Sequence, residues 1–274
     1  MNILDQIMAR KRMEVAERKA TVPDQRLRES PLFSRVVNSA RASILAFGST
    51  GIIAEFKRRS PSKGVINDQA AVAETTQGYV QAGAAVLSVL TDEPFFGGTP
   101  ADLQAARQAN PHTPILRKDF VADGYQLLEA KAWGADLVLL IAACLTPAEV
   151  RALSAQAHDL GMEVLLEVHD ADELERSICE TVDLVGVNNR NLKTFVTNID
   201  TSIRLVSQIP DQFVKVTESG LHDAATMATL HEAGYQAFLI GEAFMKTTNP
   251  AGAFQTLVSE YNPLVTRKHS HLTV

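Results

Sequence analysis

From residue 50 onward, short apolar runs rich in β-branched residues alternate with longer amphipathic stretches. This alternation is typical of parallel strands joined by helices. Eight such units predict a closed (β/α)8 barrel. An open doubly wound sheet is the alternative, but no Gly-x-Gly-x-x-Gly motif follows the first run and no second-domain pattern is present. The eight expected strands are residues 52–56, 85–90, 115–118, 136–141, 163–168, 183–188, 213–217 and 237–240.

Local signals at the ends of the expected helices support this alternation. The segments 99–102 and 146–149 resemble capping boxes with a proline at the first helical position, and Asp170 with Glu173 marks a third helix start. A glycine ends a helix without a Cβ clash because it adopts the left-handed conformation. Such glycines precede four of the expected strands, at Gly83, Gly134, Gly161 and Gly234.

The pattern predicts a single domain, with a helical extension over residues 1–49, the barrel over 50–262 and a tail over 263–274. Apolar residues near the start of the chain recur at near-helical spacing, which predicts an amphipathic helix docked on the barrel. A loop through Pro23 and a second helix before Gly48 are expected to follow. The apolar residues of the first helix are Ile3, Leu4, Ile7, Met8 and Val15.

The chain is 46% hydrophobic and 21% charged, so it can bury a core and is not a disordered protein. Its longest uncharged apolar run, residues 137–145, is shorter than the roughly 20 residues that a membrane span needs. Charge enters the N-terminus before any long apolar stretch, which argues against a signal peptide. The two cysteines, Cys144 and Cys179, lack the spacing of a disulfide framework or a zinc site. We therefore expect a cytoplasmic protein that does not contact membranes.

The net charge of −6 is unevenly distributed along the chain. Residues 1–41 hold nine Lys and Arg against five Asp and Glu, a net of +4, and the remainder holds 17 against 27, a net of −10. An acidic body argues against a general nucleic-acid binder. The basic head is either a solvated helix face or, if it folds over the mouth of the barrel, an attractor for an anion.

Active sites of this fold lie at the carboxyl ends of the strands, so polar residues there are the candidates. Glu55 and Lys57 share one face of the first strand with Ile53, and we expect them to point into the barrel mouth. A solvent-side ion pair is the alternative, although helices cover the outer face of a barrel. The following loop, residues 60–64, has hydroxyls, a glycine and a cation that suit an anion-binding lid.

Two further strands carry candidate acid–base groups. Arg117 and Lys118 must face opposite ways, so at most one lines the mouth, and Lys118 shares the face of Leu116. A partly desolvated lysine near other cations has a lowered pKa, which suits a general acid, whereas the alternative is a surface lysine. Glu167 ends an apolar strand and is the best candidate for a catalytic carboxylate. His169 shares its face, but lies further into the loop and fits a capping or packing residue better.

The last three strands supply an amide and an expected phosphate site. Asn188 can donate and accept toward a hydroxyl or carboxylate, and Arg190 either pairs an acid group or braces its loop. Gly220 and Gly241 follow the last two strands, where backbone N–H groups at helix N-termini hold phosphates in this fold. The Glu242 side chain must then point away. No metal-binding, P-loop or Gly-x-Ser-x-Gly motif is present, so we expect acid–base chemistry on a phosphorylated small molecule with neither a metal nor a cofactor.

Several segments at the predicted strand ends also carry a family resemblance, namely 55–58 with 60–64, 88–92 with 95–98, 116–120, 166–169, 187–192 and 218–220. In this order they resemble the motifs of the indole-3-glycerol phosphate synthase family, whose N-terminal extension also matches residues 1–49. The resemblance implies a carboxy-lyase of tryptophan biosynthesis. It would close the ring of 1-(2-carboxyphenylamino)-1-deoxyribulose 5-phosphate to indole-3-glycerol phosphate, carbon dioxide and water. It also implies a monomer or a weak oligomer.

The resemblance implies a role for each candidate residue. Lys118 would be the general acid at the substrate carbonyl, and Glu167 would be the general base in the later dehydration. Lys57 would bind the substrate carboxylate, and the division of proton donation between the two lysines stays open. The remaining assignments are Glu55 and Asn188 orienting the lysines and the hydroxyls, Ser60, Ser219, Gly220, Gly241 and the backbone of Glu242 holding the phosphate, Phe96 and Leu139 flanking the aromatic ring, and Arg190 and Glu218 completing the polar shell.

Three other functions compete with this one. A class I aldolase would form a Schiff base between Lys118 or Lys57 and a phosphorylated ketose. A non-catalytic barrel could bind a phosphorylated ligand, although it would not need two carboxylates and two lysines facing each other. A fusion with phosphoribosylanthranilate isomerase, known among relatives, would need room for a second barrel that the residues after 240 do not provide.

Overall fold

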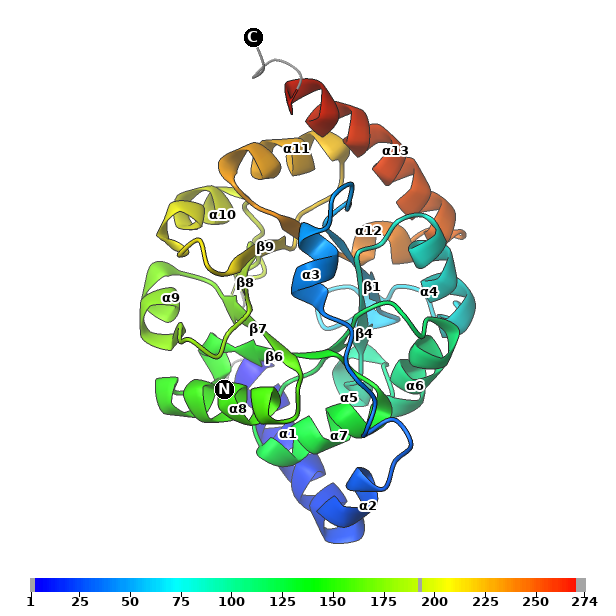
Figure 1. Ribbon diagram of the computed structural model, residues 1–274, viewed down its shortest axis with the longest axis vertical. Helices are drawn as coiled ribbons and strands as arrows, with labels where there is room; N and C mark the ends of the chain where they lie inside the picture. The colour runs from blue at the N-terminus through cyan, green and yellow to red at the C-terminus, as the bar shows by residue number, and fades with distance from the viewer. Residues whose placement is uncertain (1–2, 192–193, 270–274) are drawn as a thin grey trace.

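The computed structural model describes residues 3–191 and 194–269. Eight parallel strands form a closed barrel in the order β1-β10-β9-β8-β7-β6-β5-β4 (Figure 1). The (β/α)8 barrel is thus confirmed, and every strand boundary lies within one residue of the sequence prediction. The strands are β1 Ile52–Phe56, β4 Val86–Leu90, β5 Ile115–Lys118, β6 Leu137–Ile141, β7 Glu163–Val168, β8 Leu184–Asn188, β9 Val214–Glu218 and β10 Ala237–Ile240.

Helices surround this barrel, and their ends carry the predicted signals. Capping boxes form at Thr99 and Thr146, and the Asp170 carboxylate accepts a hydrogen bond from the backbone of Glu173. The four predicted C-terminal glycines all have positive φ, from 74° to 116°. The outer helices are α4 Val72–Gln81, α6 Pro100–Ala109, α7 Gly124–Trp133, α8 Pro147–Asp159, α9 Ala171–Ser177, α10 Asp200–Leu205, α11 Ala224–Ala233 and α13 Pro250–His269, with short helices α5 Glu93–Phe96, η1 Ala142–Cys144, η2 Val206–Gln208 and α12 Glu242–Met245.

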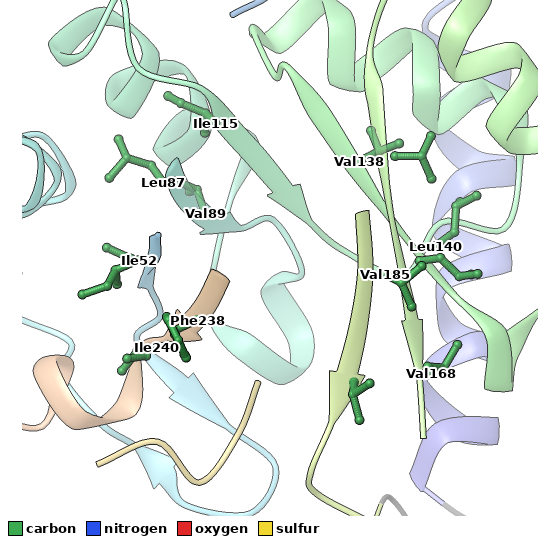
Figure 2. Close-up of a cluster of buried hydrophobic side chains, with 14 of the residues drawn as sticks. Ile52, Leu87, Val89, Ile115, Val138, Leu140, Val168, Val185, Phe238 and Ile240 are labelled. Atoms are coloured by element: carbon green, nitrogen blue, oxygen red, sulfur yellow. The ribbon is translucent and has the colours of Figure 1, made fainter. Parts of the chain in front are cut away.

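The core has two layers, because successive residues of a strand point to opposite faces. An outer layer packs between the strands and the helices and includes Ile52, Leu87 and Val138 (Figure 2). An inner layer fills the barrel and includes Ile53 and Leu116. Glu55 and Lys118, two positions after Ile53 and Leu116, therefore point inward as well and lie at the barrel mouth, as predicted.

The N-terminal extension forms three helices, α1 Ile3–Thr21, α2 Asp24–Arg28 and α3 Ala40–Leu45. The expected second helix before Gly48 is α3, while α2, which follows Pro23, was not predicted. Helix α3 lies across the amino-terminal end of the barrel (Figure 1), and its Ala40 and Ile44 complete the inner core. The backbone N–H groups of Ala40 and Arg41 donate to the Glu163 carboxylate at the start of β7, at 2.8 and 3.0 Å. The bottom of the barrel is thereby closed.

Helix α1 docks on the barrel through buried Ile7, Met8 and Val15, as predicted, but one of its cations, Lys11, is buried with them. The Lys11 side chain is only 2% exposed, and its Nζ lies 2.8 Å from Asp92 and 2.9 Å from Asp119. Further pairs join the head to barrel carboxylates, Arg18 with Glu129, Lys19 with Asp123 and Arg35 with Asp136. Much of the positive charge of the head is therefore balanced by the barrel.

Two differences from the sequence prediction concern the chain after β1 and the C-terminus. The expected lid loop contains a small antiparallel hairpin of β2 Arg59–Ser60 and β3 Gly64–Val65. Helix α13 continues through Pro263 to His269, past the boundary predicted at residue 262. Leu192 of the predicted 187–192 motif and residues 270–274 of the predicted tail lie outside the described residues. Within the described chain, none of the helices combines the length and the apolar character that crossing a membrane would require.

Candidate active site

A cavity of about 160 Å³ opens at the carboxyl ends of the strands, and every site residue predicted from the sequence lines it. Ile3, Leu4 and Ile7 of α1 form part of its wall, so the head does reach the barrel mouth, but with apolar side chains. The predicted residues lining it are Glu55, Lys57, Ser60, Phe96, Lys118, Leu139, Glu167, Asn188, Arg190, Glu218, Ser219, Gly220, Gly241 and Glu242.

Lys118 lies at the centre of the polar part of this cavity. Its Nζ is 3.5 Å from Glu218, 3.8 Å from Glu167 and 3.9 Å from Glu55. The second lysine, Lys57, places its Nζ 2.6 Å from Oε1 of Glu55. Two ammonium groups therefore face three carboxylates that come from the ends of β1, β7 and β9.

The expected lowering of the Lys118 pKa is wrong. Burial alone would lower the pKa, but the neighbouring carboxylates, with Glu218 foremost, outweigh burial and raise it above its ordinary value. The expectation assumed that other cations surround Lys118, whereas the charged groups that lie within 4 Å of its Nζ in the described chain are carboxylates. Lys118 is therefore held as an ammonium group, the form that can donate a proton.

The two carboxylates beside Lys118 on β1 and β9 respond differently to burial. Burial raises the pKa of Glu55, but Lys57 and Lys118 outweigh it and hold that pKa below the ordinary value. Burial and the charge of Glu167 instead raise the pKa of Glu218 to about 7. Among the described residues, Oε1 of Glu218 has no hydrogen-bond partner. Glu218 is thus the carboxylate of this group that takes up a proton near neutral pH.

Glu167 is held at the end of β7 by groups on both sides. The amide Nδ2 of Asn188 donates to its Oε1 at 3.1 Å. The ring Nε2 of His169 lies 3.4 Å from the same oxygen. The ring and backbone N–H of His169 also reach Glu173, at 3.1 and 2.8 Å, so His169 links two carboxylates and is not only a capping residue.

The prediction that only one of Arg117 and Lys118 lines the mouth is confirmed. Arg117 points away from the cavity and is buried 4.3 Å from the Trp133 ring. Its guanidinium also pairs with Asp119 at 2.8 Å and with Glu129 at 3.3 Å. It belongs to the ion cluster that anchors α1, and not to the site.

Apolar side chains also line the cavity. Phe96 and Leu139 are among the lining residues, and the Phe96 ring packs on Phe120 with centroids 5.9 Å apart. Phe120, Ile141 and Leu221 line the cavity as well but were not predicted. Apolar strand-end residues look like core residues in a sequence, so only the closure of the barrel identifies them.

The rim beside β9 and β10 exposes backbone to the cavity. Ser219 and Gly220 both have left-handed backbone, with φ of 69° and 78°, and a non-glycine residue in this region is a strained position. A Cβ on Gly241 would lie 2.7 Å from Oε1 of Glu55, so only glycine leaves room for that carboxylate. The Glu242 carboxylate lies 3.6 Å from the Nζ of Lys63. It is also 3.6 Å from Arg190, so both cations of the rim are already partly balanced.

The fold and the site define a (β/α)8-barrel enzyme of the acid–base type, with a rim suited to a phosphate group. The model of the indole-3-glycerol phosphate synthase family matches residues 4–257. The chain is 47% identical over 262 residues to the indole-3-glycerol phosphate synthase of Bacteroides thetaiotaomicron, covering 94% of this chain and 98% of the relative. It is 45% identical over 260 residues to that of Acidithiobacillus ferrooxidans, covering 93% and 98%. The chain belongs to the indole-3-glycerol phosphate synthase family.

More distant solved structures share only the fold. A 3-hexulose-6-phosphate synthase from Salmonella typhimurium aligns with a TM-score of 0.61 at 15% identity, over 78% of this chain and 99% of that structure. A thiamine phosphate pyrophosphorylase from Pyrococcus furiosus aligns with a TM-score of 0.60 at 14% identity, over 83% and 100%. The assignment to the family therefore rests on sequence, and the barrel is common to many enzymes.

Proposed function

We propose that the residues of this cavity carry out the decarboxylating ring closure of the family. The enzyme is a lyase of tryptophan biosynthesis, and the substrate is 1-(2-carboxyphenylamino)-1-deoxyribulose 5-phosphate. The ring carbon that bears the carboxylate attacks the ribulose carbonyl, carbon dioxide leaves, and water is then lost. The position of the Lys118 ammonium group among three buried carboxylates, in a cavity that is also lined by apolar side chains, carries this proposal.

Lys118 is proposed as the general acid of ring closure. Attack by the ring carbon breaks aromaticity, so the carbonyl oxygen must gain a proton as the new bond forms. The surrounding carboxylates keep Lys118 protonated, which supports this role. The same charge opposes the rival aldolase mechanism, because a Schiff base requires a neutral amine as the nucleophile.

Glu167 is proposed as the general base of the dehydration. It is a buried carboxylate 3.8 Å from Lys118, so the proton it removes can return to the general acid. Lys57 is proposed to bind the substrate carboxylate, and Glu55 and Asn188 to orient the lysines and the hydroxyls. Lys57 lies 2.6 Å from Glu55, so part of its charge is balanced by that carboxylate. Lys57 can therefore bind the substrate carboxylate without stabilising it so strongly that the loss of carbon dioxide is slowed.

The aromatic ring and the phosphate of the substrate are assigned to two other parts of the cavity. We propose that Phe96 and Leu139 flank the aromatic ring. The phosphate is assigned to Ser60 and to the backbone of the rim, where Ser219 and Gly220 have left-handed backbone. The rim residues are Ser219, Gly220, Gly241 and Glu242, with Arg190 and Glu218 completing the polar shell.

The direct test is to incubate the purified chain with the carboxyphenylamino-ribulose phosphate and to follow indole fluorescence. We expect turnover by the wild type and a loss of at least about 100-fold in kcat for both Lys118→Met and Glu167→Gln, because each removes one acid–base group. Lys19→Met serves as the control and should keep full activity. It removes an exposed ion pair between Lys19 of α1 and Asp123 of the barrel. Absence of product from folded wild-type protein contradicts the function, and full activity of Lys118→Met contradicts its role.

Several broader expectations also remain proposals. We propose a single domain with the boundaries given above, a cytoplasmic location, and a monomer or a weak oligomer. We expect no nucleic-acid partner, since the barrel body is acidic and Lys11, Arg18 and Arg35 of the head already pair with barrel carboxylates. Sedimentation of the purified chain tests the oligomeric state directly.

A further inference from the structure

Beside the proposed general base, an imidazole ring is clamped between two carboxylates. Oε2 of Glu173 accepts a hydrogen bond from the His169 backbone N–H at 2.8 Å and lies 3.1 Å from the ring Nδ1. Glu173 is itself fixed, because Asp170 caps the first turn of α9 through the Glu173 N–H. These contacts set the orientation of the ring and turn its Nε2 toward Oε1 of Glu167, 3.4 Å away.

The ring is enclosed as well as oriented. The His169 and Glu173 side chains are 12% and 14% exposed, and that of Glu167 is 4% exposed. Nε2 is buried and forms no hydrogen bond of ordinary geometry within the described chain. Burial lowers the pKa of His169, but Glu173 and then Glu167 outweigh burial and raise it above the ordinary value. The ring is therefore biased toward the imidazolium form.

Glu167 needs a positive neighbour of this kind. A general base must be ionised, yet Glu167 is buried and Glu218 stands close enough for the two carboxylates to repel each other. Lys118 lies nearer to Glu218, at 3.5 Å, than to Glu167, at 3.8 Å, and it gives up its own charge when it acts as an acid. At that moment the remaining charged neighbour that favours an ionised Glu167 is His169.

We propose that His169, fixed by Glu173, is a positioning residue that keeps Glu167 ionised and aimed for proton abstraction. This rests on the proposed function, in which Glu167 is the general base. Asn188 supports the same oxygen through a neutral amide and so contributes orientation without charge. Two further charged groups face this pair. Glu218 on β9 also raises the pKa of His169, and Lys118 on β5 lies 3.8 Å from Glu167. The Cys144 thiol in η1 lies in the field of Glu167, and its pKa is also affected by Asp5 and Arg12 of α1.

The proposal predicts a shift in the pH dependence of turnover. In His169→Gln the Glu167 carboxylate loses a cationic partner that lies 3.4 Å from its Oε1, so the acid limb of kcat should move up by about one pH unit or more. Activity lost at low pH should be recovered at high pH. In Glu173→Gln the ring loses its own anionic partner, so the limb should move in the same direction by a smaller amount.

A measurement without substrate separates this inference from the proposed function. Nitrogen chemical shifts of 15N-labelled histidine report the protonation of the His169 ring in wild-type protein. We expect the pKa of the ring to lie above its ordinary value of 6.5 and to fall in both Glu167→Gln and Glu173→Gln. His158, which pairs with Asp183 at 2.8 Å at the amino-terminal end of β7, serves as the internal control, and its nitrogen shifts should be the same in all three proteins.

Two results would overturn the inference. One is a uniform loss of kcat in His169→Gln with no movement of the acid limb, which is the pattern of a packing residue. The other is a His169 ring that titrates below its ordinary pKa or ignores the Glu167→Gln change. If His169→Gln fails to fold, Glu173→Gln and the nitrogen titration still decide the question. Lack of turnover in the wild type would contradict the proposed function alone.

Discussion

Two ammonium groups and three carboxylates meet at the mouth of the barrel, and the His169 ring lies beside one of the carboxylates, Glu167. Lys57 lies 2.6 Å from Glu55, so Glu218 has Lys118 as its close cation among the described residues and shares it with Glu167. Two carboxylates that share one cation in a buried site cannot both ionise easily. Glu218 is the one whose pKa rises to about 7, through burial and the charge of Glu167. It can therefore act as a proton store beside the general acid.

This pKa predicts a pH-dependent stability. The folded pKa of Glu218, about 7, lies above its ordinary value of 4.5, so the folded chain binds more protons than the unfolded chain between these values. The contribution of Glu218 to the free energy of unfolding is full below pH 4.5 and is lost as the pH rises through 7. In Glu218→Gln this loss should be absent. In urea unfolding, the free energy of unfolding of the variant should therefore rise relative to that of wild type, by at most about 3 kcal/mol, between pH 4.5 and 7.

Glu55→Gln provides a control of opposite sign. The pKa of Glu55 is held below its ordinary value by Lys57 and Lys118, although burial opposes this. Its contribution to stability is therefore present above pH 4.5 and is lost as the pH falls. The Glu55→Gln variant should lose most stability relative to wild type near neutral pH. Parallel curves for the two variants would contradict the assignment of the proton to Glu218.

Which of these residues reach the site could be predicted from the sequence, but their charge states could not. Strand periodicity alone places Glu55, Lys118 and Glu167 on inward faces. The pKa of Lys118 depends on which charges surround it, and those charges come from strands far apart in the chain. His169 was assigned to capping or packing because it lies beyond the strand, in the loop. Its contacts with Glu173 of the next helix and with Glu167 could not be read from that position.

Helix α1 is fixed to the barrel by a buried charge as well as by its apolar face. Lys11 lies between Asp92, after β4, and Asp119, after β5, and all three side chains are no more than 2% exposed. Asp119 also directly follows Lys118 in the chain. The contact therefore joins the docking of α1 to the strand end that carries the proposed general acid.

Lys11→Met should be strongly destabilising. It leaves two buried carboxylates without their shared cation, and breaking a buried ion pair in this way costs about 3 to 5 kcal/mol. Lys19→Met on the same helix breaks a half-exposed pair with Asp123 and should cost at most about 1 kcal/mol. Urea unfolding of the two variants measures the contrast. Equal small losses would show that Lys11 is not part of the docking energy.

At the level of elements, the regular parts were predictable and the irregular parts were not. Each barrel strand is a short apolar run bounded by turn signals, so its position follows from local sequence. The hairpin of β2 and β3 has strands of two residues, too short to show any period. The apolar stripe of α1 predicted its docking, but the burial of Lys11 depends on Asp92 and Asp119, more than 80 residues away.

Over the whole molecule, the charge of the head and the charge of the rim have different roles. The head carries a net charge of +4, but Lys11, Arg18 and Lys19 pair with carboxylates of the barrel. The expectation that the head attracts an anionic substrate therefore weakens. Lys63 in the hairpin loop has a side chain that is 56% exposed, more than those of Lys57, Lys118 and Arg190, and its partner Glu242 lies 3.6 Å away.

The contrast between the cations of the head and Lys63 at the rim predicts which charge makes substrate binding depend on salt. Removing the charge in Lys63→Gln should raise KM severalfold at an ionic strength of about 0.01 M, because the Debye length there is about 30 Å and the rim field reaches incoming phosphate. The increase should shrink at about 0.5 M, where screening cuts off the field within a few ångström. Lys19→Gln removes an equal charge from the head and should leave KM unchanged at both salt concentrations. Lys19 lies near the C-terminal end of α1, whereas the residues of α1 that line the cavity are Ile3, Leu4 and Ile7. Similar increases in KM for the two variants would mean that the net charge of the molecule, and not its placement at the rim, steers the substrate.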